Sequence, residues 1–519
     1  MRFACRLHVR VVVTLLLCCA LQGTAAAAED ASSYRAALDS IVAADLGAHV
    51  EQLASDEMEG REAGTRGGLA AAEYLAKQYA RRHLSAAGDG GKFFQPFEPN
   101  FRNVLAIVEG RDPKLREQVI VVCAHYDHVG YGGLSSLGGY GYLHPGADDN
   151  ASGTAAVLQV ARALSRLASP PKRSILLANW DGEEKGLLGS KHWTAHPTLP
   201  IRRVVAAINL DMIGRLRDDQ LKVFASRSGF GWRRLVSSQN DEPHLRLDFS
   251  WSVEQRADHY PLFERRIPVL MFHTGLHEDY HRPSDVASQI DTRGMERITR
   301  LLFGVVYDLA ERPATPGFRA AARHESPADE QAMLGEVARP ADRLGVGWSD
   351  DAATTDGILV STVAAGSAAE RAGIQEGDLI TRVAGRRILC DDDFYAAVAA
   401  AESPASITVR RSDRQEPLDL KTRLDGQPLR WGFTWRVDDA EPGSVILTHV
   451  IPGTPAARAG LIAGDRIDQV AGRDFADEAA FALLAKRATE SLELLVERDG
   501  RLRLLTLRLR DGKSIKRAA

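Results

Sequence analysis

The sequence predicts an α/β protein in which a mixed, mostly parallel sheet is sandwiched by helices and is followed by two small β-rich domains. Three observations predict this architecture. Apolar runs of strand length alternate with segments of helical periodicity from residue 34 to residue 309. Polar and charged side chains follow the ends of several of these runs. Two stretches nearer the C-terminus, 366–386 and 453–473, repeat one another.

Length and composition are those of a globular protein with several domains. The chain has 519 residues, of which 45% are hydrophobic and 26% are charged. The formal net charge is -4. Charge therefore gives no reason to expect nucleic acid or an anionic membrane surface as a partner.

The first 28 residues have the pattern of a signal peptide. Arg2, Arg6 and Arg10 precede a short apolar run at 11–21, and small residues at 26–28 suit cleavage. The apolar run is too short to span a membrane comfortably. We expect the segment to be removed on export to the periplasm or the extracellular space, which leaves no integral membrane segment in the mature chain.

A first domain is expected at 29–312. Its helices are predicted at 34–53, 69–84, 186–196 and 294–309, with one more directly after Asp149. Its strands are predicted at 93–97, 103–108, 119–123, 173–180, 204–210 and 268–272. Strands separated by helices favour a sheet with helices on both faces. A stretch rich in Pro, Ala and charge at 313–339 is expected to be a linker, with one short helix at 328–337.

Residues 340–424 and 425–512 are predicted to be two copies of one domain, followed by a tail at 513–519. The stretch GSAAERAGIQEGDLITRVAGR begins at Gly366, and GTPAARAGLIAGDRIDQVAGR begins at Gly453. Many identities recur at one constant offset of 87 residues, which indicates a duplication. Each copy is expected to be small and β-rich, with one helix.

Potential metal ligands lie where strands of the first domain end. Four of them follow strands, and these are His125, Glu184, Asp211 and His281. Asp149 lies at the start of the helix that follows the first of these strands. In open α/β sheets, ligands bind beyond the carboxyl ends of the strands, so we expect these side chains on one rim of the sheet. Scattered surface carboxylates would not be confined in this way.

Five imidazole and carboxylate ligands are more than a zinc site of three or four ligands needs. They suit two divalent cations that share one bridging carboxylate. Two cations about 3.5–4 Å apart can hold a water between them and clamp a carbonyl oxygen, as in aminopeptidases. Glu183 lies next to a ligand but need not bind metal. We predict that Glu183 is the general base for this water.

Asp127 and Asp285 are predicted to contact the metal ligands and orient them without binding metal themselves. Asp127 is two residues from His125, and on an extended chain two such side chains share a face. Asp127 can therefore orient the His125 imidazole, or it can act on the site through a neighbouring residue. Asp285 is predicted to do the same for His281. Three further histidines are expected to be neighbours of the site and not ligands: His128, His273 and His277.

These segments resemble the M28 family of zinc peptidases, the co-catalytic aminopeptidases. The resembling motifs are AHYDH around His125, PGADDNASG around Asp149, DGEEKGLLGS around Glu184, NLDMIG around Asp211 and HTGLHEDYHRPSD around His281. The similarity runs from about residue 45, including LASDEMEGREAGTRG, to about residue 309. It implies the zinc-peptidase fold, with the five ligands holding two Zn²⁺ ions, Asp149 as the bridge and Glu183 as the base.

The same resemblance implies that Asp258 and His259, in the motif ADHYPLF, line the substrate site. Zinc is the metal it implies, although imidazole and carboxylate ligands also accept manganese or cobalt. Peptides are the implied substrates.

The two repeated domains resemble PDZ domains. By that resemblance the carboxylate-binding loops are Leu344, Gly345, Val346 and Gly347 in the first copy and Trp431, Gly432 and Phe433 in the second. Such loops present backbone N–H groups to a peptide C-terminus, which then adds as a strand. Neither copy contains a Gly-Leu-Gly-Phe string. Capture of peptides and docking against the catalytic domain are therefore both open as roles for the pair.

The leading hypothesis from the sequence is an exported di-zinc aminopeptidase that removes N-terminal residues from peptides. A single-zinc cyclotransferase like the glutaminyl cyclases, which share the fold, is a second hypothesis. A carboxypeptidase on the same scaffold is a third. The last is a non-catalytic protein that binds its partners through the PDZ pair. The preferred N-terminal residue, the natural substrate and the native metal are left open.

Overall fold

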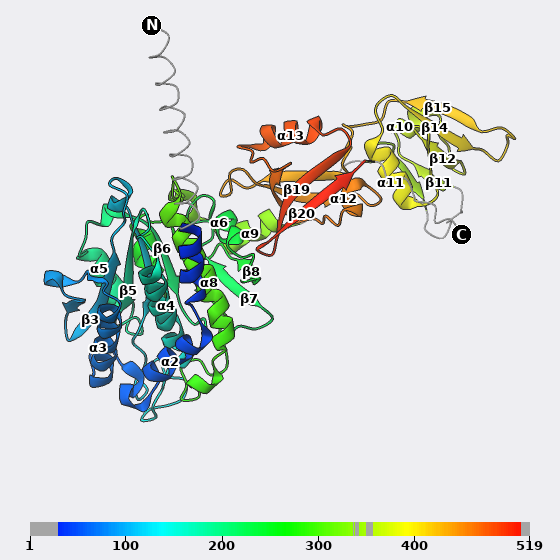
Figure 1. Ribbon diagram of the computed structural model, residues 1–519. Helices are drawn as coiled ribbons and strands as arrows, with labels where there is room; N and C mark the ends of the chain where they lie inside the picture. Colours follow the sequence, from blue (N-terminus) through cyan, green and yellow to red (C-terminus); the bar gives the residue numbers. More distant parts are fainter. Residues whose placement is uncertain (1–29, 336, 338–341, 349–356, 510–519) are drawn as a thin grey trace, which may run out of the picture. The chain divides into compact units, whose positions relative to one another are not determined.

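The computed structural model describes residues 30–335, 337, 342–348 and 357–509 (Figure 1). The predicted signal peptide at 1–28 and the predicted tail at 513–519 lie outside the described residues. By its internal contacts the chain divides into two compact units. The first is Met1–Pro327 with Asp499–Arg501, and the second is Ala328–Arg498 with Leu502–Ala519. The division after Pro327 falls inside the predicted linker at 313–339.

The first unit is built on one nine-stranded mixed sheet. Its order along the main path is β1-β3-β5-β4-β6-β9-β7-β8, and β2 pairs with β3. The strands are β1 (Ser85–Ala86), β2 (Phe94–Phe97), β3 (Phe101–Val108), β4 (Val119–His125), β5 (Ser174–Trp180), β6 (Val204–Leu210), β7 (Gln220–Phe224), β8 (Arg246–Phe249) and β9 (Val269–His273). The four central strands, β5, β4, β6 and β9, are mutually parallel. Antiparallel pairings join β3 and β7 to this centre.

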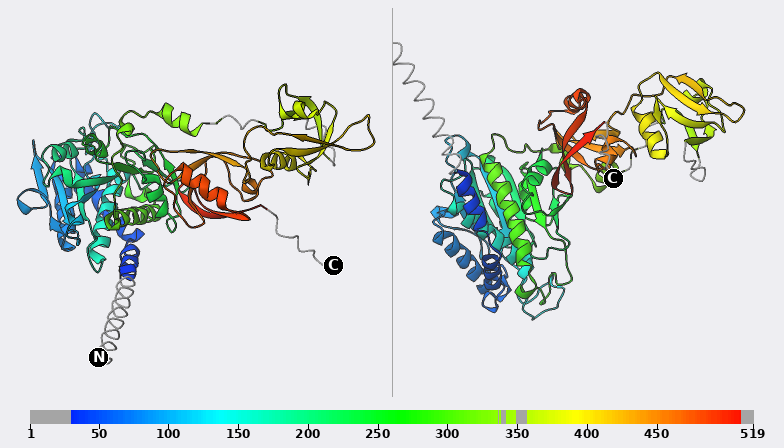
Figure 2. Two further views of the ribbon diagram at one scale, coloured as in Figure 1. Left: turned by 90° about the horizontal axis from the view of Figure 1, so that it is seen from above. Right: turned by 45° about the vertical axis from the view of Figure 1, so that its right-hand side comes forward.

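Helices cover both faces of this sheet (Figures 1 and 2). One face packs against α2 (Ala43–Leu53), α3 (Arg66–Arg81), α4 (Gly153–Arg166) and α8 (Thr292–Glu311), and the other against α5 (Leu188–Ala195) and α7 (His259–Glu264). Alternate residues of β4 serve the two layers: Ile120 and Val122 join the first core, and Val121 and Cys123 the second. Burial on both faces explains why β4 is a continuous apolar run.

The mixed sheet between helical layers confirms the fold class predicted from the sequence, and several boundaries differ. The predicted helix at 34–53 is two helices, at 30–39 and at α2, because the chain turns at 40–42. The sequence prediction missed β7, β8, α6 (Trp232–Ser238) and α7. Each of these elements is four to seven residues long, which is too short to show a clear period.

The beginning of the predicted linker packs against the first unit. Phe318 lies against Phe263 with a ring-centroid distance of 5.5 Å. Arg319 pairs with Glu325 at 2.6 Å, and its backbone N–H donates to the Ser228 carbonyl. The short helix predicted at 328–337 is α9 (Pro327–Leu334). Among the described residues, no helix has both the length and the apolar character that a membrane span needs.

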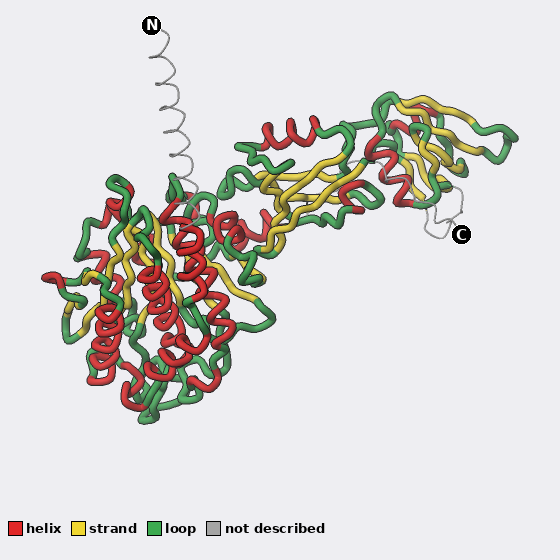
Figure 3. The backbone as a smooth tube through the Cα atoms, in the orientation of Figure 1, coloured by secondary structure: helices red, strands yellow, loops and turns green. Residues whose placement is uncertain are grey.

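The second unit contains two antiparallel sheets of similar plan (Figure 3). The first sheet has the order β10-β11-β12-β14-β15, with β13 beside β12, and the second has the order β16-β17-β18-β19-β20. The strands of the first sheet are β10 (Val346–Trp348), β11 (Ile358–Val363), β12 (Leu379–Val383), β13 (Arg386–Arg387), β14 (Ala405–Arg410) and β15 (Leu418–Thr422). Those of the second are β16 (Phe433–Val437), β17 (Val445–Val450), β18 (Arg466–Val470), β19 (Ser491–Arg498) and β20 (Arg501–Arg508). The helices are α10 (Ala368–Ala372), α11 (Asp391–Ala400), α12 (Pro455–Arg458) and α13 (Glu478–Arg487).

The duplication extends to specific pairs of side chains, in which a half-buried arginine meets a buried aspartate. Arg411 binds Asp378 at 2.7 Å in the first copy, and Arg498 binds Asp465 at 2.6 Å in the second. In each copy a tryptophan of the edge strand also meets a phenylalanine of the long helix edge to face. The two copies therefore share specific contacts as well as a sequence pattern.

Candidate metal centre

The strand register brings the predicted ligands to one edge of the sheet. His125 pairs with Trp180 across β4 and β5, so the turn that carries Glu184 begins where β4 ends. Asp211 directly follows β6, which runs parallel to both β4 and β9. His281 lies in the loop after β9. Because parallel strands end on one side, side chains far apart in the sequence converge there.

One cluster of potential ligand atoms joins Asp149, Glu184, His281 and His128, and these atoms all lie within 4.8 Å of one another. The Nε2 atom of His281 lies 3.0 Å from Asp149 Oδ2 and 3.2 Å from Glu184 Oε2. The Nδ1 atom of His128 lies 3.0 Å from Glu184 Oε1. His128 was expected to be a neighbour of the site, and the structure places it in direct contact with a predicted ligand.

A second cluster joins His125, Glu183 and Asp211, again with ligand atoms within 4.8 Å of one another. His125 Nε2 lies 3.7 Å from Asp211 Oδ1 and 3.4 Å from Asp149 Oδ1. The two oxygens of Asp149 therefore face different imidazoles, Oδ1 toward His125 and Oδ2 toward His281. This is the arrangement that a bridging carboxylate needs.

The chemistry of these donors fits divalent cations such as zinc. Imidazole nitrogen and carboxylate oxygen are common zinc ligands, with bonds of about 2.0–2.2 Å. Ligand atoms around a tetrahedral ion with such bonds are about 3.3 Å apart, close to the separations at His281 and His125. The carboxylates of Asp149, Glu183, Glu184 and Asp211 also bring several negative charges into one partly buried space, which requires compensating positive charge.

The pKa shifts of these groups reflect the need for positive charge near the clustered carboxylates. Burial raises the pKa of Glu183 well above its ordinary value, His125 opposes the rise, and Glu184 adds to it. Burial alone would lower the pKa of His281, but its hydrogen bonds to Asp149 and Glu184 raise the pKa to about 11. Bound cations would replace protons in this balance.

Asp127 and Asp285 hold the backbone of the ligand loops. The Asp127 carboxylate accepts hydrogen bonds from the N–H groups of Glu183, at 3.0 Å, and Glu184, at 3.3 Å. His125 Nδ1 lies 3.2 Å from the Asp127 backbone carbonyl and 3.8 Å from its carboxylate. The backbone carbonyl of Asp127 is therefore the nearer partner of the His125 imidazole. The Asp127 carboxylate, which was predicted to orient this imidazole, instead faces the turn that carries Glu183.

Asp285 differs from its predicted role beside His281. Its carboxylate accepts from the N–H groups of Asp148 and Asp149, at 3.0 and 3.1 Å. The partner of His281 Nδ1 is the Ser135 carbonyl, at 2.8 Å. Spacing along the chain could not reveal these partners, because each bond joins segments more than 130 residues apart.

The segment that carries Asp149 is anchored to β6 by its neighbour. Asn150 donates to the Leu210 carbonyl at 2.9 Å and accepts from the N–H of Gly153 at 2.9 Å. Asp148 is fully buried and accepts from the Gly214 N–H at 2.6 Å. These bonds join the segment before α4 to the end of β6. They therefore fix the positions of Asp149 and Asp211 relative to one another.

Asp258 and His259 are buried beside the centre. Ser190 donates to Asp258 Oδ1 at 2.5 Å, while Asp258 Oδ2 and both ring nitrogens of His259 have no hydrogen-bond partner among the described residues. Burial raises the pKa of Asp258 to about 6 and lowers that of His259 to about 4. The charge of Asp258 also contributes to the raised pKa of Glu183. Unpartnered polar atoms so close to the base suit a site that contacts substrate.

Arg61 is a structural residue of the site that the sequence prediction missed. Its side chain is fully buried and donates to four backbone carbonyls, those of Leu53, Tyr126, Pro145 and Gly146. Burial lowers its pKa to about 10, and nearby carboxylates, Asp149 foremost, oppose this. Nothing in the sequence distinguishes this arginine from the others of its Gly-rich loop, because its partners come from distant segments.

Arg61→Met is expected to destabilise the first unit by about 3–5 kcal/mol, because the substitution leaves several buried carbonyls without a donor. The measurement is the midpoint of urea unfolding of the full chain. Arg66→Met is the matched control, since Arg66 is exposed and pairs with Glu59 at the surface, and it should cost about 1 kcal/mol or less. Equal midpoints for the two variants would contradict a structural role for Arg61.

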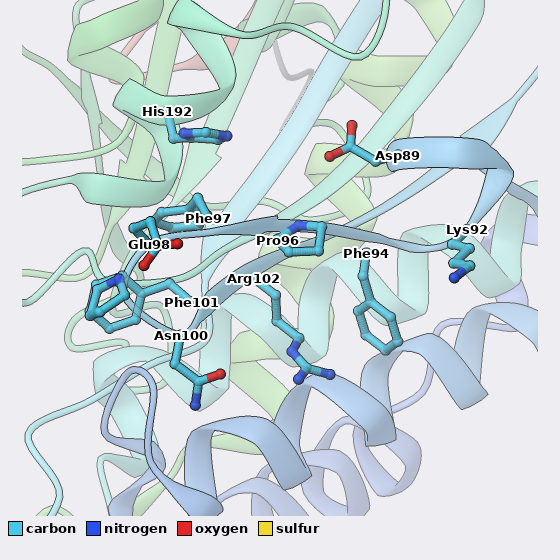
Figure 4. Close-up of a pocket in the computed structure, with 11 residues that line it drawn as sticks. Asp89, Lys92, Phe94, Pro96, Phe97, Glu98, Asn100, Phe101, Arg102 and His192 are labelled. Carbon is cyan, nitrogen blue, oxygen red and sulfur yellow. The ribbon is translucent and has the colours of Figure 1, made fainter.

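A cavity of 870 Å³ lies on the hairpin of β2 and β3 (Figure 4). Its aromatic and charged lining includes Phe94, Phe97, Phe101, Arg102 and His192. None of the predicted site residues lines it. The Arg102 backbone N–H donates to the Asp181 carboxylate at 2.9 Å, which ties this hairpin to the turn that carries Glu183.

Each of the predicted PDZ loops contains a glycine in the left-handed region of backbone conformation. Gly345 and Gly432 have φ values of 81° and 84°. A Cβ atom at either position would meet Ser367 or Thr454 at less than 2.5 Å, so glycine is needed at both. Leu344, Val346, Trp431 and Phe433 are buried.

The two copies also differ at the residue two positions before each loop, which is Asp342 in the first copy and Leu429 in the second. In the first copy, the Asp342 carboxylate accepts from the N–H groups of Leu344 at 2.9 Å and Val346 at 3.1 Å. Leu429 stands at the equivalent position of the second copy, and its side chain accepts no hydrogen bond. An internal carboxylate thus already binds part of the first loop.

Comparison with known proteins matches both parts of the chain. Residues 103–306 match the sequence model described as Peptidase family M28, and residues 359–411 and 446–498 each match that of the PDZ domain. The resemblances predicted from the sequence are confirmed by these matches. Each matched range lies within the domain predicted for it.

The relatives share only part of their length with this chain. Aminopeptidase YwaD of Bacillus subtilis (strain 168) is 28% identical over 228 residues, which cover 41% of this chain and 46% of that protein. Leupeptin-inactivating enzyme 1 of Streptomyces exfoliatus is 30% identical over 174 residues, covering 33% of this chain and 36% of that protein. The solved LapA aminopeptidase of Legionella pneumophila aligns with a TM-score of 0.46 and 20% identity, covering 55% of this chain and 75% of that chain. The chain thus spans about half or less of these two curated relatives.

Proposed function

We propose that this protein, which carries an M28 peptidase domain and two PDZ domains, is an exported aminopeptidase that uses two zinc ions. The observation that supports this most is the position of Asp149, whose two oxygens lie 3.4 Å from His125 and 3.0 Å from His281. Glu184 and Asp211 complete the two ligand groups. Such a bridged pair is typical of metal-dependent peptide hydrolysis.

When bound, the cations would polarise the peptide carbonyl and lower the pKa of the attacking water. Glu183 takes a proton from this water as its oxygen bonds to the carbonyl carbon. Glu183 then gives the proton to the leaving nitrogen as the C–N bond breaks. The bond from the Glu183 N–H to the Asp127 carboxylate holds the base in place.

Peptides with apolar residues are the proposed substrates. A Gly-rich loop at 130–144 is held beside His281, because Ser135 accepts from the imidazole and Leu137 donates its N–H to the His281 carbonyl. Large apolar side chains on this loop are exposed, and these are Tyr131, Leu134, Leu137, Tyr140 and Tyr142. Exposed apolar groups next to a catalytic centre favour contact with apolar substrate side chains.

The PDZ pair is proposed to bind peptides or partner proteins. The second copy is the better candidate for a free C-terminal carboxylate, since Asp342 already accepts from two N–H groups of the first loop. Export is proposed from the signal-peptide pattern of residues 1–28.

The function is tested with leucine p-nitroanilide and short peptides, each with a free or an acetylated N-terminus. We expect release of the N-terminal residue from the free forms only, and loss of this release on chelation. Shortening from the C-terminus would instead indicate a carboxypeptidase. Ammonia release from N-terminal glutamine without shortening would indicate a cyclase. No reaction across a broad panel would contradict the proposal and favour a binding protein.

A further inference from the structure

His128 is a buried histidine to which the proposed reaction assigns no role. Its side chain is fully buried, and its Nδ1 atom lies 3.0 Å from Glu184 Oε1. The same atom is 3.8 Å from Asp149 Oδ2. The ring lies edge-on to the ring of His281, with a centroid distance of 5.5 Å. His128 therefore touches one predicted ligand closely and the bridging ligand loosely.

The positions of the ring protons separate His128 from the two predicted histidine ligands. In each of those, the nitrogen away from the centre contacts a backbone carbonyl: Asp127 for His125, at 3.2 Å, and Ser135 for His281, at 2.8 Å. Histidines that ligate metals almost always donate their second ring N–H in this way. With a cation bound, each ring would therefore offer an unprotonated Nε2 to it.

His128 lacks such an outer acceptor. Its Nε2 is buried and has no hydrogen-bond partner among the described residues. Were Nδ1 to bind metal, the proton would have to sit on Nε2, where it meets no acceptor of the kind that the outer nitrogens of His125 and His281 have. A proton on Nδ1 instead makes a hydrogen bond to the Glu184 carboxylate, and bonds to charged groups are the stronger kind.

We propose that His128 is a positioning residue that donates its Nδ1–H to Glu184 Oε1, so that Oε2 is the oxygen offered to the metal. This proposal rests on the proposed metal centre. Glu184 Oε2 lies 3.2 Å from His281 Nε2, on the side where the other ligand atoms gather. With Oε1 held by His128, the Glu184 carboxylate cannot rotate. The conformational entropy of this side chain is therefore lost when the protein folds, and metal binding does not have to order it again.

The ring of His128 is itself held in place by packing. A Cβ atom at Gly146 would lie 2.4 Å from its Cδ2 atom, so the backbone of Gly146 lies directly against the imidazole. Gly146 has a φ of 59° and belongs to the turn before Asp149. The same turn therefore places the bridging ligand and restrains the residue that orients Glu184.

The test is zinc affinity, measured by competition with a chromophoric chelator in the full chain without substrate. His128→Ala should weaken one bound zinc by about 10–100-fold, the range found for residues that support metal ligands. His128→Asn should restore most of this loss, because the asparagine amide nitrogen can take the place of Nδ1 as a donor. His49→Ala is the matched control, since His49 is also buried but bonds to Tyr74 away from the site.

Several results would overturn the proposal. Equal losses in His128→Ala and His128→Asn, with a changed visible spectrum of the cobalt-substituted protein, would make His128 a metal ligand. Unchanged affinity in His128→Ala would leave it without a role at the centre. Circular dichroism of both variants identifies misfolding. If His128→Ala misfolds, the zinc affinity of His128→Asn is compared with that of the wild-type chain instead. A tenfold loss of affinity in His128→Asn would then contradict the role of His128 as a donor.

The zinc-affinity experiment tests the role of His128 independently of the proposed function, since it involves no peptide hydrolysis. Tight zinc binding without aminopeptidase activity would contradict the function and leave the role of His128 intact. Absence of zinc binding by the wild-type chain would overturn both.

Discussion

Glu183→Gln is expected to lower kcat by about 10²–10⁴-fold, because glutamine cannot carry a proton from the attacking water to the leaving amine. Metal content should stay at the wild-type value, since Glu183 is proposed as a base and not as a ligand. KM should change little, because the amide fills the same space. The measurements are steady-state kinetics with leucine p-nitroanilide and elemental analysis of the purified variant.

The structure makes metal content the decisive part of this experiment. A carboxylate oxygen of Glu183 lies in the same ligand group as His125 and Asp211, so geometry alone allows Glu183 to bind an ion. Loss of one ion in Glu183→Gln would contradict the role of base. Glu62→Gln is the control, since Glu62 pairs with Lys185 in an exposed contact and should leave kcat unchanged.

Removal of metal is expected to abolish activity and to lower the melting temperature of the first unit by roughly 10 °C or more. Each ion held at a thousandfold excess over its Kd adds about 4 kcal/mol to the free energy of unfolding. Without ions, the clustered carboxylates of Asp149, Glu184 and Asp211 lose the positive charge that the cations would supply. The measurement is calorimetry of the full chain with and without chelator.

Chelator already saturated with zinc is the control for this experiment, because it adds the same solute without stripping metal. Activity and the melting transition should both return on addition of zinc. The PDZ transitions should not move, since neither metal-ligand cluster among the described residues lies in the PDZ domains. An unchanged melting temperature after complete loss of metal would show that the centre contributes nothing to folding.

The convergence of the predicted ligands at one edge of the sheet could be predicted because it follows from local rules. β4 is apolar up to His125, its last residue, and is buried on both faces, which marks it as a central parallel strand. Parallel neighbours must end at the same edge, so the polar residue after each strand is placed by the order of elements alone. His125, Glu184 and Asp211 were found in this way. The repeat offset located the two PDZ domains by the same kind of local evidence.

The partners of these ligands were not predictable, because they depend on contacts between distant segments. Asp127 and Asp285 were chosen from short spacing, yet their carboxylates hold the backbone of Glu183 and Asp149. His128 is three residues from His125 and gives no sign in the sequence that it contacts Glu184, 56 residues away. Whether a histidine binds metal or orients a ligand depends on where its second nitrogen lies.

The sequence by itself determined the class of fold, the duplicated C-terminal domains and the identity of the residues that meet at the end of the sheet. These follow from periodicity, strand ends and internal repetition, which are properties of short segments. Only the tertiary structure decided which oxygen faces which imidazole, which carbonyls surround Arg61 and which loop amides Asp342 occupies. The physical reason is that hydrogen bonds are directional and short, so their partners are decided by the packing of whole elements and not by distance along the chain.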